Sequence, residues 1–141
     1  MLAPRHLRRP IGGRILGDGR EHSPLDEAAI HAAIDYFRAE GVQAVAISFL
    51  WSVRNPSHEQ RAAELVRAAL PEVFVCTGCE VFPQIREYTR TSTTVVNAYL
   101  SPVMARYVAR IDSLFQALGA QQPVRYFQSN GGLAPGHLMR E

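Results

Sequence analysis

REYTRTSTTVVNAYLSP, residues 86–102, organises this sequence, because a dense polar cluster directly precedes a long apolar helix pattern. Each of its two arginines can donate a forked pair of hydrogen bonds to a carboxylate or a phosphate. If the stretch is helical, Arg86 and Arg90 share one face, and we expect one of them to pair with Glu87 or Glu80. The cluster is therefore either a buried network that braces the fold or a ligand site. Its candidate residues are Arg86, Glu87, Arg90, Thr94 and Asn97.

Length and composition indicate one globular domain. Of the 141 residues, 47% are hydrophobic and 20% are charged, which is typical of a soluble protein with a real core. A net charge of +2 is too small to indicate a nucleic-acid partner. No apolar run is long enough to span a bilayer, and two cysteines without a secretion signal favour the reducing cytoplasm. We therefore expect a cytoplasmic protein that binds neither nucleic acid nor membrane.

Residues 1–23 differ from the rest in charge. Five arginines and a single acid, Asp18, precede Glu21. No amphipathic stripe accompanies the charge, so we expect a surface arm rather than a targeting peptide. Gly17-Asp18-Gly19 also matches the turn of a short hairpin. The sequence thus predicts a basic arm or hairpin over 1–23, followed by an α/β domain over 24–141.

Apolar periodicity predicts the first helix and strand of this domain. A helix over 25–40 begins after a cap at Ser23 or Asp26 and ends at Gly41. The nearly unbroken apolar run over 43–51 is typical of a strand that is buried on both faces.

A second helix and strand follow with short links. The helix over 57–70 opens with a Ser57–Gln60 capping box, or alternatively at Asn55-Pro56. A short strand over 73–77 comes next. Strand, helix and strand joined in this way form a βαβ unit, so the two strands should be parallel. The predicted fold class is α/β with a parallel βαβ core.

The C-terminal third predicts one long helix and a third strand. Ser101-Pro102 suits a helix start, since proline is favoured at the first helical position, and the helix would run over 102–118. A strand over 124–128 follows, which we expect to be the third strand of the parallel core, and 133–141 has the pattern of the start of another helix. The loop between them could approach an anion through its main-chain N–H groups or form a tight turn that requires positive φ. Its residues are Ser129, Asn130, Gly131 and Gly132.

Two further patterns contain residue types that bind metals or take part in catalysis. Cys76 and Cys79 form a Cys-x-x-Cys pattern at a strand end, which suits a redox dithiol, a metal ligand pair or coincidence. No second cysteine pair or spaced histidine pair accompanies it, so no metal site is predicted. His58 and Glu59 lie in the first turn of the second helix. A favourable interaction with the helix dipole explains Glu59, and an acid–base role is the alternative.

Five blocks, in this order, make the chain resemble the hydantoinase A / 5-oxoprolinase family, which includes acetone and acetophenone carboxylase subunits. The resemblance begins near Arg14 and covers the rest of the chain. The fourth block and the Ser-Asn-Gly-Gly of the fifth are the most specific. The blocks are PLDE (24–27), AVAISFL (44–50), NPSHE (55–59), REYTRTSTTVVNAYLSP (86–102) and QSNGG (128–132).

The resemblance implies both a fold and a reaction. The fold is part of an actin-like ATPase of the sugar kinase and Hsp70 type, whose two lobes clamp ATP and magnesium. The reaction opens a cyclic amide, of the 5-oxoproline or hydantoin type, after phosphorylation of its oxygen, and a hydantoinase B-type subunit or domain completes the hydrolysis. Arginine, magnesium and main-chain N–H groups stabilise the charge in such a transfer. The resemblance puts the 86–97 cluster near the cleft, with the 129–132 loop beside it.

The chain departs from the family in length. Family members are several times longer, and their acidic, glycine-rich phosphate loops are not in these residues. We therefore expect a fragment that binds ATP and magnesium only weakly, is inactive alone and packs against the missing lobes of its parent. The alternative is a non-catalytic α/β module that binds a partner subunit.

Overall fold

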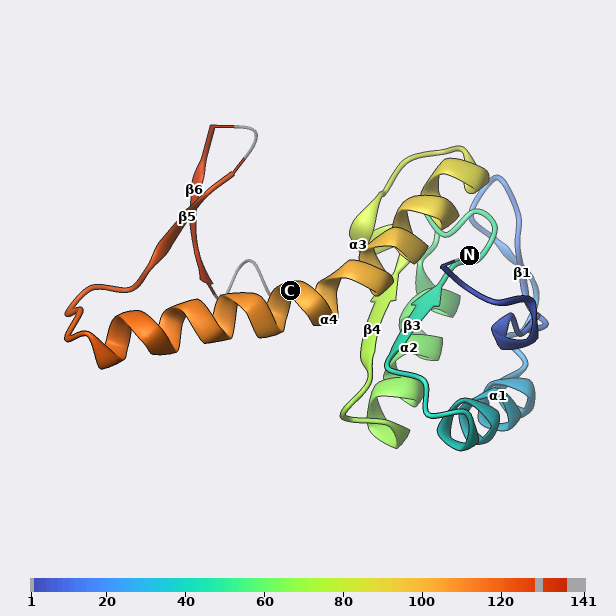
Figure 1. Ribbon diagram of the computed structural model, residues 1–141. Helices are drawn as coiled ribbons and strands as arrows, with labels where there is room; N and C mark the ends of the chain where they lie inside the picture. The colour runs from blue at the N-terminus through green and yellow to red at the C-terminus, as the bar shows by residue number, and fades with distance from the viewer. Residues whose placement is uncertain (1, 129–130, 137–141) are drawn as a thin grey trace. The chain divides into compact units, whose positions relative to one another are not determined.

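A computed structural model describes residues 2–128 and 131–136 (Figure 1). The chain divides into two compact units, Met1–Tyr99 and Leu100–Glu141. One helix, α4 (Glu87–Ala117), contributes residues to both. Each unit has its own small sheet or hairpin.

The centre of the first unit is the predicted βαβ arrangement. Strand β3 (Ala44–Ile47), helix α2 (Ser57–Ala69) and strand β4 (Phe74–Thr77) follow one another. The two strands pair in parallel, with Val45 opposite Val75, which confirms the predicted direction. Buried and half-buried residues alternate in β3, whereas the last three residues of β4 are all buried. The core consists of Ile30, Ile34, Val45, Ile47, Ala62, Ala63, Val66, Leu70 and Val75.

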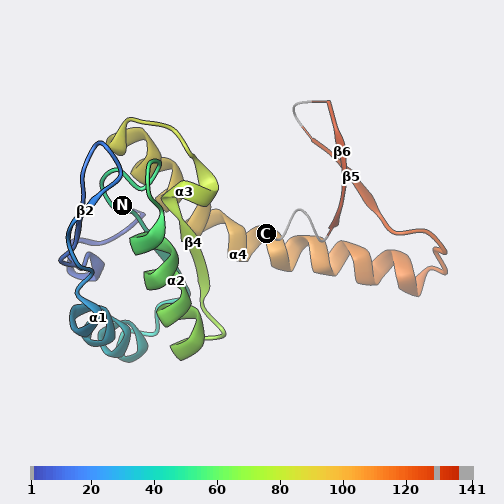
Figure 2. The ribbon, with the colours of Figure 1, turned by 180° about the vertical axis from the view of Figure 1, so that it is seen from behind.

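Helix α1 (Glu27–Ala39) lies beside α2, as the front and back views show (Figures 1 and 2). Its cap is Asp26, whose carboxylate accepts a hydrogen bond of 2.9 Å from the main-chain N–H of Ala29. Gly41 follows the helix with φ of +64°, which a glycine adopts without strain. The predicted helix boundaries are thus correct to within two residues.

Two local predictions in this unit were wrong. The strand predicted over 43–51 ends at Ile47, because the N–H of Phe49 binds a side chain instead of continuing the ladder. The Ser57–Gln60 capping box is not formed; the Asn55 side chain accepts from the N–H of Ser57 at 3.1 Å, which supports the alternative start.

The N-terminal residues contain a short 3-10 helix, η1 (Arg5–Leu7), and a hairpin. Strand β1 (Arg14–Ile15) pairs antiparallel with β2 (Glu21–Ser23). Between the strands, Gly19 has φ of +89° and its N–H donates to Leu16. The hairpin that Gly17-Asp18-Gly19 indicates is therefore present.

The long helix begins earlier than the sequence predicts. Helix α4 starts at Glu87 and spans 31 residues, with Pro102 inside it rather than at its first position. Proline lacks the N–H that the helix would use, but its fixed φ is helical. The polar cluster of residues 86–97 is thus mostly the first turns of α4. The predicted helix start at Ser101-Pro102 was wrong.

The second unit contains a hairpin instead of a third parallel strand. Strand β5 (Arg125–Phe127) pairs antiparallel with β6 (Leu133–Pro135), so the predicted helix over 133–141 was wrong at its start; residues 137–141 lie outside the described residues. The Tyr126 hydroxyl donates to Asp112 at 2.9 Å and ties the hairpin to α4. None of the helices in the described ranges is both long and apolar enough for a membrane span.

Candidate functional site

The carboxyl ends of β3 and β4 lie side by side, because the strands are parallel and Ile47 pairs with Thr77. In open α/β sheets, ligands bind beyond this edge. The loop after β3 (48–56) and the segment between β4 and α4 (78–86) both leave from it; the short helix α3 (Gly78–Val81) opens the second one. We call these segments loop A and loop B. The start of α4 reaches the same edge, where the hydroxyls of Ser48 and Thr91 are 2.8 Å apart.

Glu59 from α2 is buried between the two loops, with no exposed surface. One carboxylate oxygen accepts the N–H of Phe49 at 2.8 Å, and the other accepts the N–H of Cys79 at 2.7 Å. The favourable interaction with the helix dipole that we predicted for Glu59 did not include these two hydrogen bonds.

Arg90 from α4 is also fully buried. Its guanidinium donates to the carbonyl of Phe49 at 2.9 Å and to that of Gln84 at 3.0 Å. The expected ion pair with Glu87 or Glu80 is absent among the described residues. Glu80 instead contacts Arg67 at 3.4 Å and caps α3 in a box with Thr77.

Arg86 and Glu87 lie where loop B meets α4. Arg86 is exposed and has φ of 98°, which is unusual for a residue with a side chain. Glu87 is half-buried and is the first residue of α4. Of the candidate residues in the cluster, Arg86 presents its charge to solvent at this edge.

Thr94 and Asn97 lie one and two turns further along α4. Thr94 is buried, and its hydroxyl donates to the carbonyl of Arg90 at 2.7 Å, so it is bonded within its own helix. Asn97 is half-buried and hydrogen bonds with the Cys76 thiol. The contacts of the Cys76 thiol with Asn97 and with the carbonyl of Thr94 attach α4 to β4.

The Cys-x-x-Cys pair has the electrostatics of structural thiols. Both cysteines are free. Burial raises the pKa of Cys76, and it raises that of Cys79 to about 11. A reactive cysteine needs a lowered pKa, so these environments do not favour the redox alternative.

His58 is buried beside this site and faces the N-terminal hairpin. Its Nε2 is 3.3 Å from the Glu21 carboxylate, whereas Nδ1 has no hydrogen-bond partner among the described residues. A Cβ added at Gly13 would lie 3.1 Å from Nδ1. The ring therefore packs tightly against the main chain at Gly13, and its burial leaves it remote from solvent.

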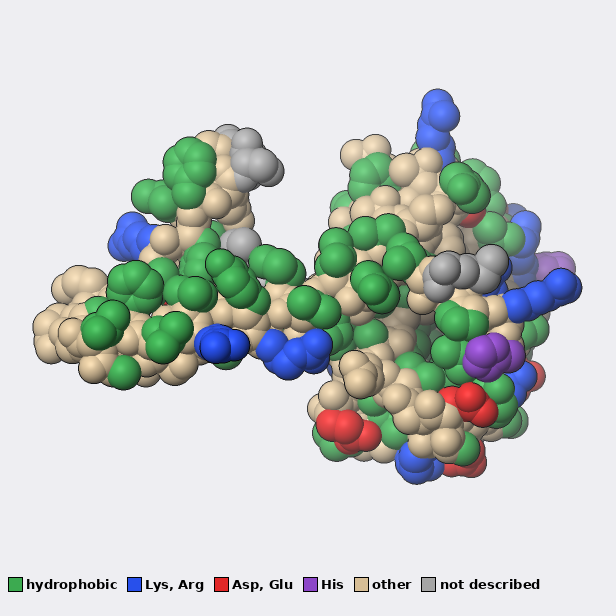
Figure 3. Space-filling view, viewed as in Figure 1, with side chains coloured by type: hydrophobic (Ala, Val, Ile, Leu, Met, Phe, Trp, Pro, Cys, Tyr) green, Lys and Arg blue, Asp and Glu red, His purple; other side chains and the backbone are tan. Residues whose placement is uncertain are grey.

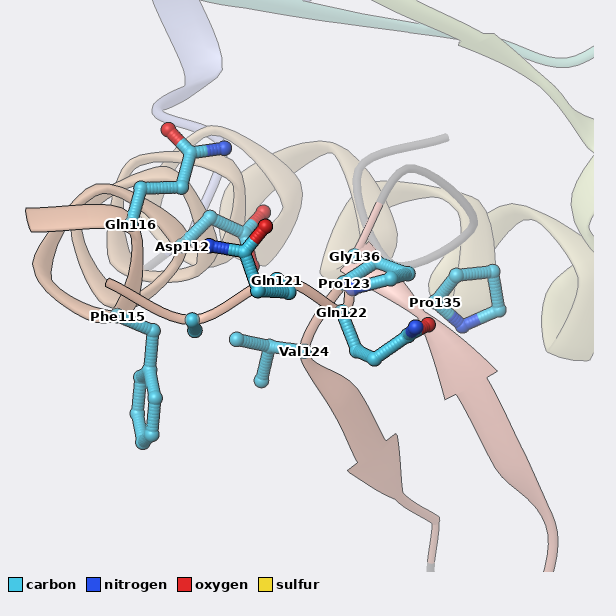
Figure 4. Close-up of a pocket in the computed structure, with 10 residues that line it drawn as sticks. Asp112, Phe115, Gln116, Gln121, Gln122, Pro123, Val124, Pro135 and Gly136 are labelled. Atoms are coloured by element: carbon cyan, nitrogen blue, oxygen red, sulfur yellow. The ribbon is translucent and has the colours of Figure 1, made fainter. Parts of the chain in front are cut away.

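The glycine loop belongs to the second unit. Gly131 has φ of +87° and its N–H donates to Gln128, so it forms the tight turn of the β5–β6 hairpin. Ser129 and Asn130 lie outside the described residues. A cavity of about 250 Å³ in this unit lies between α4 and the hairpin (Figure 4), and none of the predicted site residues lines it. Its walls include Asp112, Phe115, Gln116, Gln121 and Pro135.

Across residues 2–128 and 131–136, no three His, Cys, Asp or Glu side chains gather as metal ligands would. The candidate site consists of main-chain groups of loops A and B, the exposed Arg86 and the buried charges behind them.

Two family models match this chain. The model of the hydantoinase/oxoprolinase N-terminal region matches residues 1–70, and the hydantoinase/oxoprolinase model matches residues 90–141. The chain belongs to the hydantoinase/oxoprolinase family, which confirms the resemblance of its sequence blocks.

Relatives of known function support the same family. The chain is 83% identical, over all 141 residues, to the caprolactamase subunit alpha of Pseudomonas jessenii, and it covers 20% of that protein. It is 31% identical over 111 residues to the 5-oxoprolinase of Saccharomyces cerevisiae. The aligned region covers 79% of this chain and 8% of that protein. The chain thus spans a fifth or less of the length of these relatives.

Solved structures confirm the fold class. A crystal structure of ATP-dependent caprolactamase from Pseudomonas jessenii matches with a TM-score of 0.93 and 84% identity, over 96% of this chain and 20% of that one. A nucleotide-free acetone carboxylase matches with a TM-score of 0.79 and 26% identity, over 97% and 20%. The chain has the α/β fold of the corresponding part of these ATP-dependent enzymes.

Proposed function

We propose that this chain is part of an ATP-dependent hydrolase that opens a cyclic amide, and that the substrate is a lactam of the caprolactam type. The observation that carries the proposal is the 83% identity to a caprolactamase subunit over the whole chain. The TM-score of 0.93 to a caprolactamase structure supports it. The 5-oxoproline and hydantoin rings that the family resemblance implies are the competing substrates.

The exposed candidate residues have defined roles in this proposal. An unstrained amide is a poor electrophile, so charge that develops on its oxygen must be stabilised. Arg86 can donate to that oxygen or to a transferred phosphate, and Glu87 and Asn97 orient the ring. Arg90 and Thr94 are buried, so in this proposal they support the site without contacting the substrate. The predicted contribution of Ser129, Asn130, Gly131 and Gly132 to the substrate site comes from the family resemblance alone.

In this proposal, other parts of the longer protein bind ATP and magnesium, because the acidic, glycine-rich phosphate loops that the family resemblance implies are not in these 141 residues. ATP supplies the activation of the amide. A hydantoinase B-type subunit completes the hydrolysis; the subunit name of the caprolactamase relative supports a multi-subunit enzyme. The two free cysteines suit the reducing cytoplasm.

The test is lactam-dependent ADP release by the full-length protein that contains this chain, co-purified with its hydantoinase B-type partner. We expect ε-caprolactam to stimulate ADP release and to be opened to the amino acid, with 5-oxoproline and hydantoin turned over more slowly. If none of the three rings stimulates ADP release, the proposed function is wrong.

Variants of the exposed residues test their roles. Arg86→Ala should lower turnover by about a hundredfold with little change in melting temperature, because Arg86 is exposed and acts only on charge in the reaction. Arg106→Ala, which removes another exposed arginine from α4, is the matched control. Normal turnover by Arg86→Ala would exclude Arg86 from the site.

A second candidate function is a non-catalytic interaction module. The observation that favours it is the set of exposed apolar side chains on α4, which includes Val103, Tyr107 and Leu114. In this function, substitutions on α4 weaken assembly of the parent protein with its partner subunit. Complexes that do assemble retain ATP-dependent lactam opening. Turnover measured in the purified, assembled complex separates the two functions.

A further inference from the structure

We propose that Glu59 and Arg90 are positioning residues, whose two buried and opposite charges join loops A and B into one rigid unit. The proposal rests on the proposed function, in which Arg86, at the end of loop B, acts on the reacting amide. Neither side chain touches the substrate; each acts through the main chain that it holds.

Glu59 joins the two loops through their N–H groups. It accepts from Phe49 in loop A and from Cys79 in loop B, at 2.8 and 2.7 Å. Hydrogen bonds to an ionised carboxylate are shorter and stronger than neutral ones. Because the two oxygens bind different loops, the loops cannot shift relative to each other without breaking one of these bonds.

Arg90 joins the same two loops through their carbonyl groups. It donates to Phe49 in loop A at 2.9 Å and to Gln84 in loop B at 3.0 Å. The main chain of Phe49 is thus held on its N–H by an anion from α2 and on its carbonyl by a cation from α4.

Gly78, at the start of loop B, shows how closely the two side chains approach. A Cβ added there would lie 3.2 Å from the Cδ of Arg90 and 3.2 Å from a carboxylate oxygen of Glu59. This spacing is tighter than ordinary van der Waals contact. Both side chains are therefore packed against the side of Gly78 from which a Cβ would project, and they leave no free space for a larger residue there.

Backbone strain lies next to the points that Arg90 holds. In the described part of the chain, two residues other than glycine have positive φ: Trp51 in loop A, at 60°, and Arg86 at the end of loop B, at 98°. They follow Phe49 and Gln84, the two carbonyl partners of Arg90, by two residues each. Strained conformations persist where the surrounding structure fixes them, and they cluster at functional sites.

A brace alone would not require two charges. Burying a charge is costly, and well-packed apolar side chains often stabilise a core equally well. Charges bonded to main-chain groups instead fix where those groups lie, which is the requirement of a preorganised site. A role in stability and a role in loop geometry therefore predict different results for substitutions of Glu59 and Arg90, and the two experiments below distinguish them.

The first experiment measures hydrogen exchange in the full-length protein, in peptides that contain Phe49 or Cys79. Glu59→Gln keeps the shape of the side chain but turns an NH₂ group toward one of the two main-chain N–H groups. We expect exchange in at least one of these peptides to become about tenfold faster. Glu64→Gln, an exposed carboxylate on the same helix, is the control and should change neither. Unchanged exchange in Glu59→Gln would overturn the proposal.

The second experiment measures kinetics of the folded variants Glu59→Gln and Arg90→Lys with ε-caprolactam and ATP. We expect kcat to fall about tenfold or more while KM changes less than about twofold. The reason is that the variants disturb the geometry of the reacting groups but keep the contacts that bind the ground state and the transition state equally. A structural role alone would leave kcat per folded molecule at the wild-type value, and that result would overturn the proposal. If the wild-type protein opens no lactam, the proposed function and the catalytic role fail together, while exchange still decides whether Glu59 holds the loops.

Discussion

At the scale of single residues, the thiol of Cys79 is the clearest electrostatic case. It lies in loop B near the carboxylates of Glu59 and Glu80, and burial is the main reason that its pKa is raised to about 11. Its main-chain N–H donates to Glu59, which brings a negative charge close. Both effects disfavour the thiolate, which is the form that reacts.

We therefore predict slow alkylation of Cys79 by iodoacetamide. At pH 8, a pKa of about 11 leaves roughly 0.1% thiolate, against about a quarter for an ordinary cysteine. A more basic thiolate is more nucleophilic, which recovers part of the difference, so the rate should be about tenfold or more below that of the unfolded chain. The rate should rise as pH increases toward 11. Mass spectrometry after timed quenching measures it, and alkylation at the unfolded rate would restore the redox alternative.

Glu59 shows which contacts the sequence could not predict. Its position in the first turn of α2 is explained by the helix dipole alone. Its partners Phe49 and Cys79 are 10 and 20 residues away in the chain. They come together only because β3 and β4 pair in parallel and bring both loops to one edge. The sequence indicated a further role for this residue only through the acid–base alternative and through the NPSHE block of the family resemblance.

Arg90 shows the opposite case, a residue that the sequence identified but whose partners it did not. Forked donors indicate a carboxylate or phosphate partner, and the expected partner was Glu87 or Glu80. In the structure, main-chain carbonyls take that place. Residue type predicts how many hydrogen bonds a side chain can make, whereas the tertiary fold decides which acceptors are near.

At the scale of elements, α1 is the helix whose start the sequence predicts best. Asp26 was one of two cap candidates, and its side chain accepts from the N–H of Ala29. Asp26→Ala should lower the free energy of unfolding by about 1 kcal/mol, because the N–H loses its acceptor. Asp26→Asn keeps an acceptor and should cost only a few tenths. Urea unfolding of the purified chain measures both; equal losses would show that the carboxylate charge, not the cap bond, matters.

The residue types in α4 explain why the sequence predicted its start at the wrong position. Serine and threonine favour caps over helix interiors, and proline favours the first turn, so the sequence indicated a boundary at Ser101-Pro102. In the structure the hydroxyl of Thr94 bonds to a carbonyl one turn earlier, which makes a threonine-rich segment compatible with a helix. The Cys76 thiol also contacts the carbonyl of Thr94. Tertiary contacts thus outweighed local preference.

At the scale of the whole molecule, the parallel βαβ core was predictable and the C-terminal hairpin was not. Buried apolar strands joined through an amphipathic helix have few other solutions. The segment after residue 124 is short, and its third strand could pair in either direction. The side-chain bond from Tyr126 to Asp112 and the turn at Gly131 decide it, and neither follows from periodicity.

The exposed side chains of α4 are the main feature that the described chain leaves unexplained. In the second unit, the helix carries apolar side chains with exposed fractions from 38% to 57%, and Leu118, directly after it, is 83% exposed. Figure 3 shows hydrophobic side chains gathered along this part of α4. The residues on the helix are Leu100, Val103, Met104, Tyr107, Leu114 and Phe115. Large exposed apolar patches on soluble proteins generally mark an interface.

We therefore predict that the isolated 141-residue chain binds a hydrophobic dye and self-associates as its concentration rises. The physical reason is that apolar area on α4 gains about 25 cal/mol for each Å² removed from water. The double variant Leu114→Gln with Leu118→Gln should lower dye fluorescence severalfold, since Leu118 is 83% exposed and Leu114 is 52% exposed. Arg110→Gln, a polar change on the same helix, should leave it unchanged. Dye titration and light scattering measure both effects, and a monodisperse wild-type monomer without dye binding would contradict the prediction.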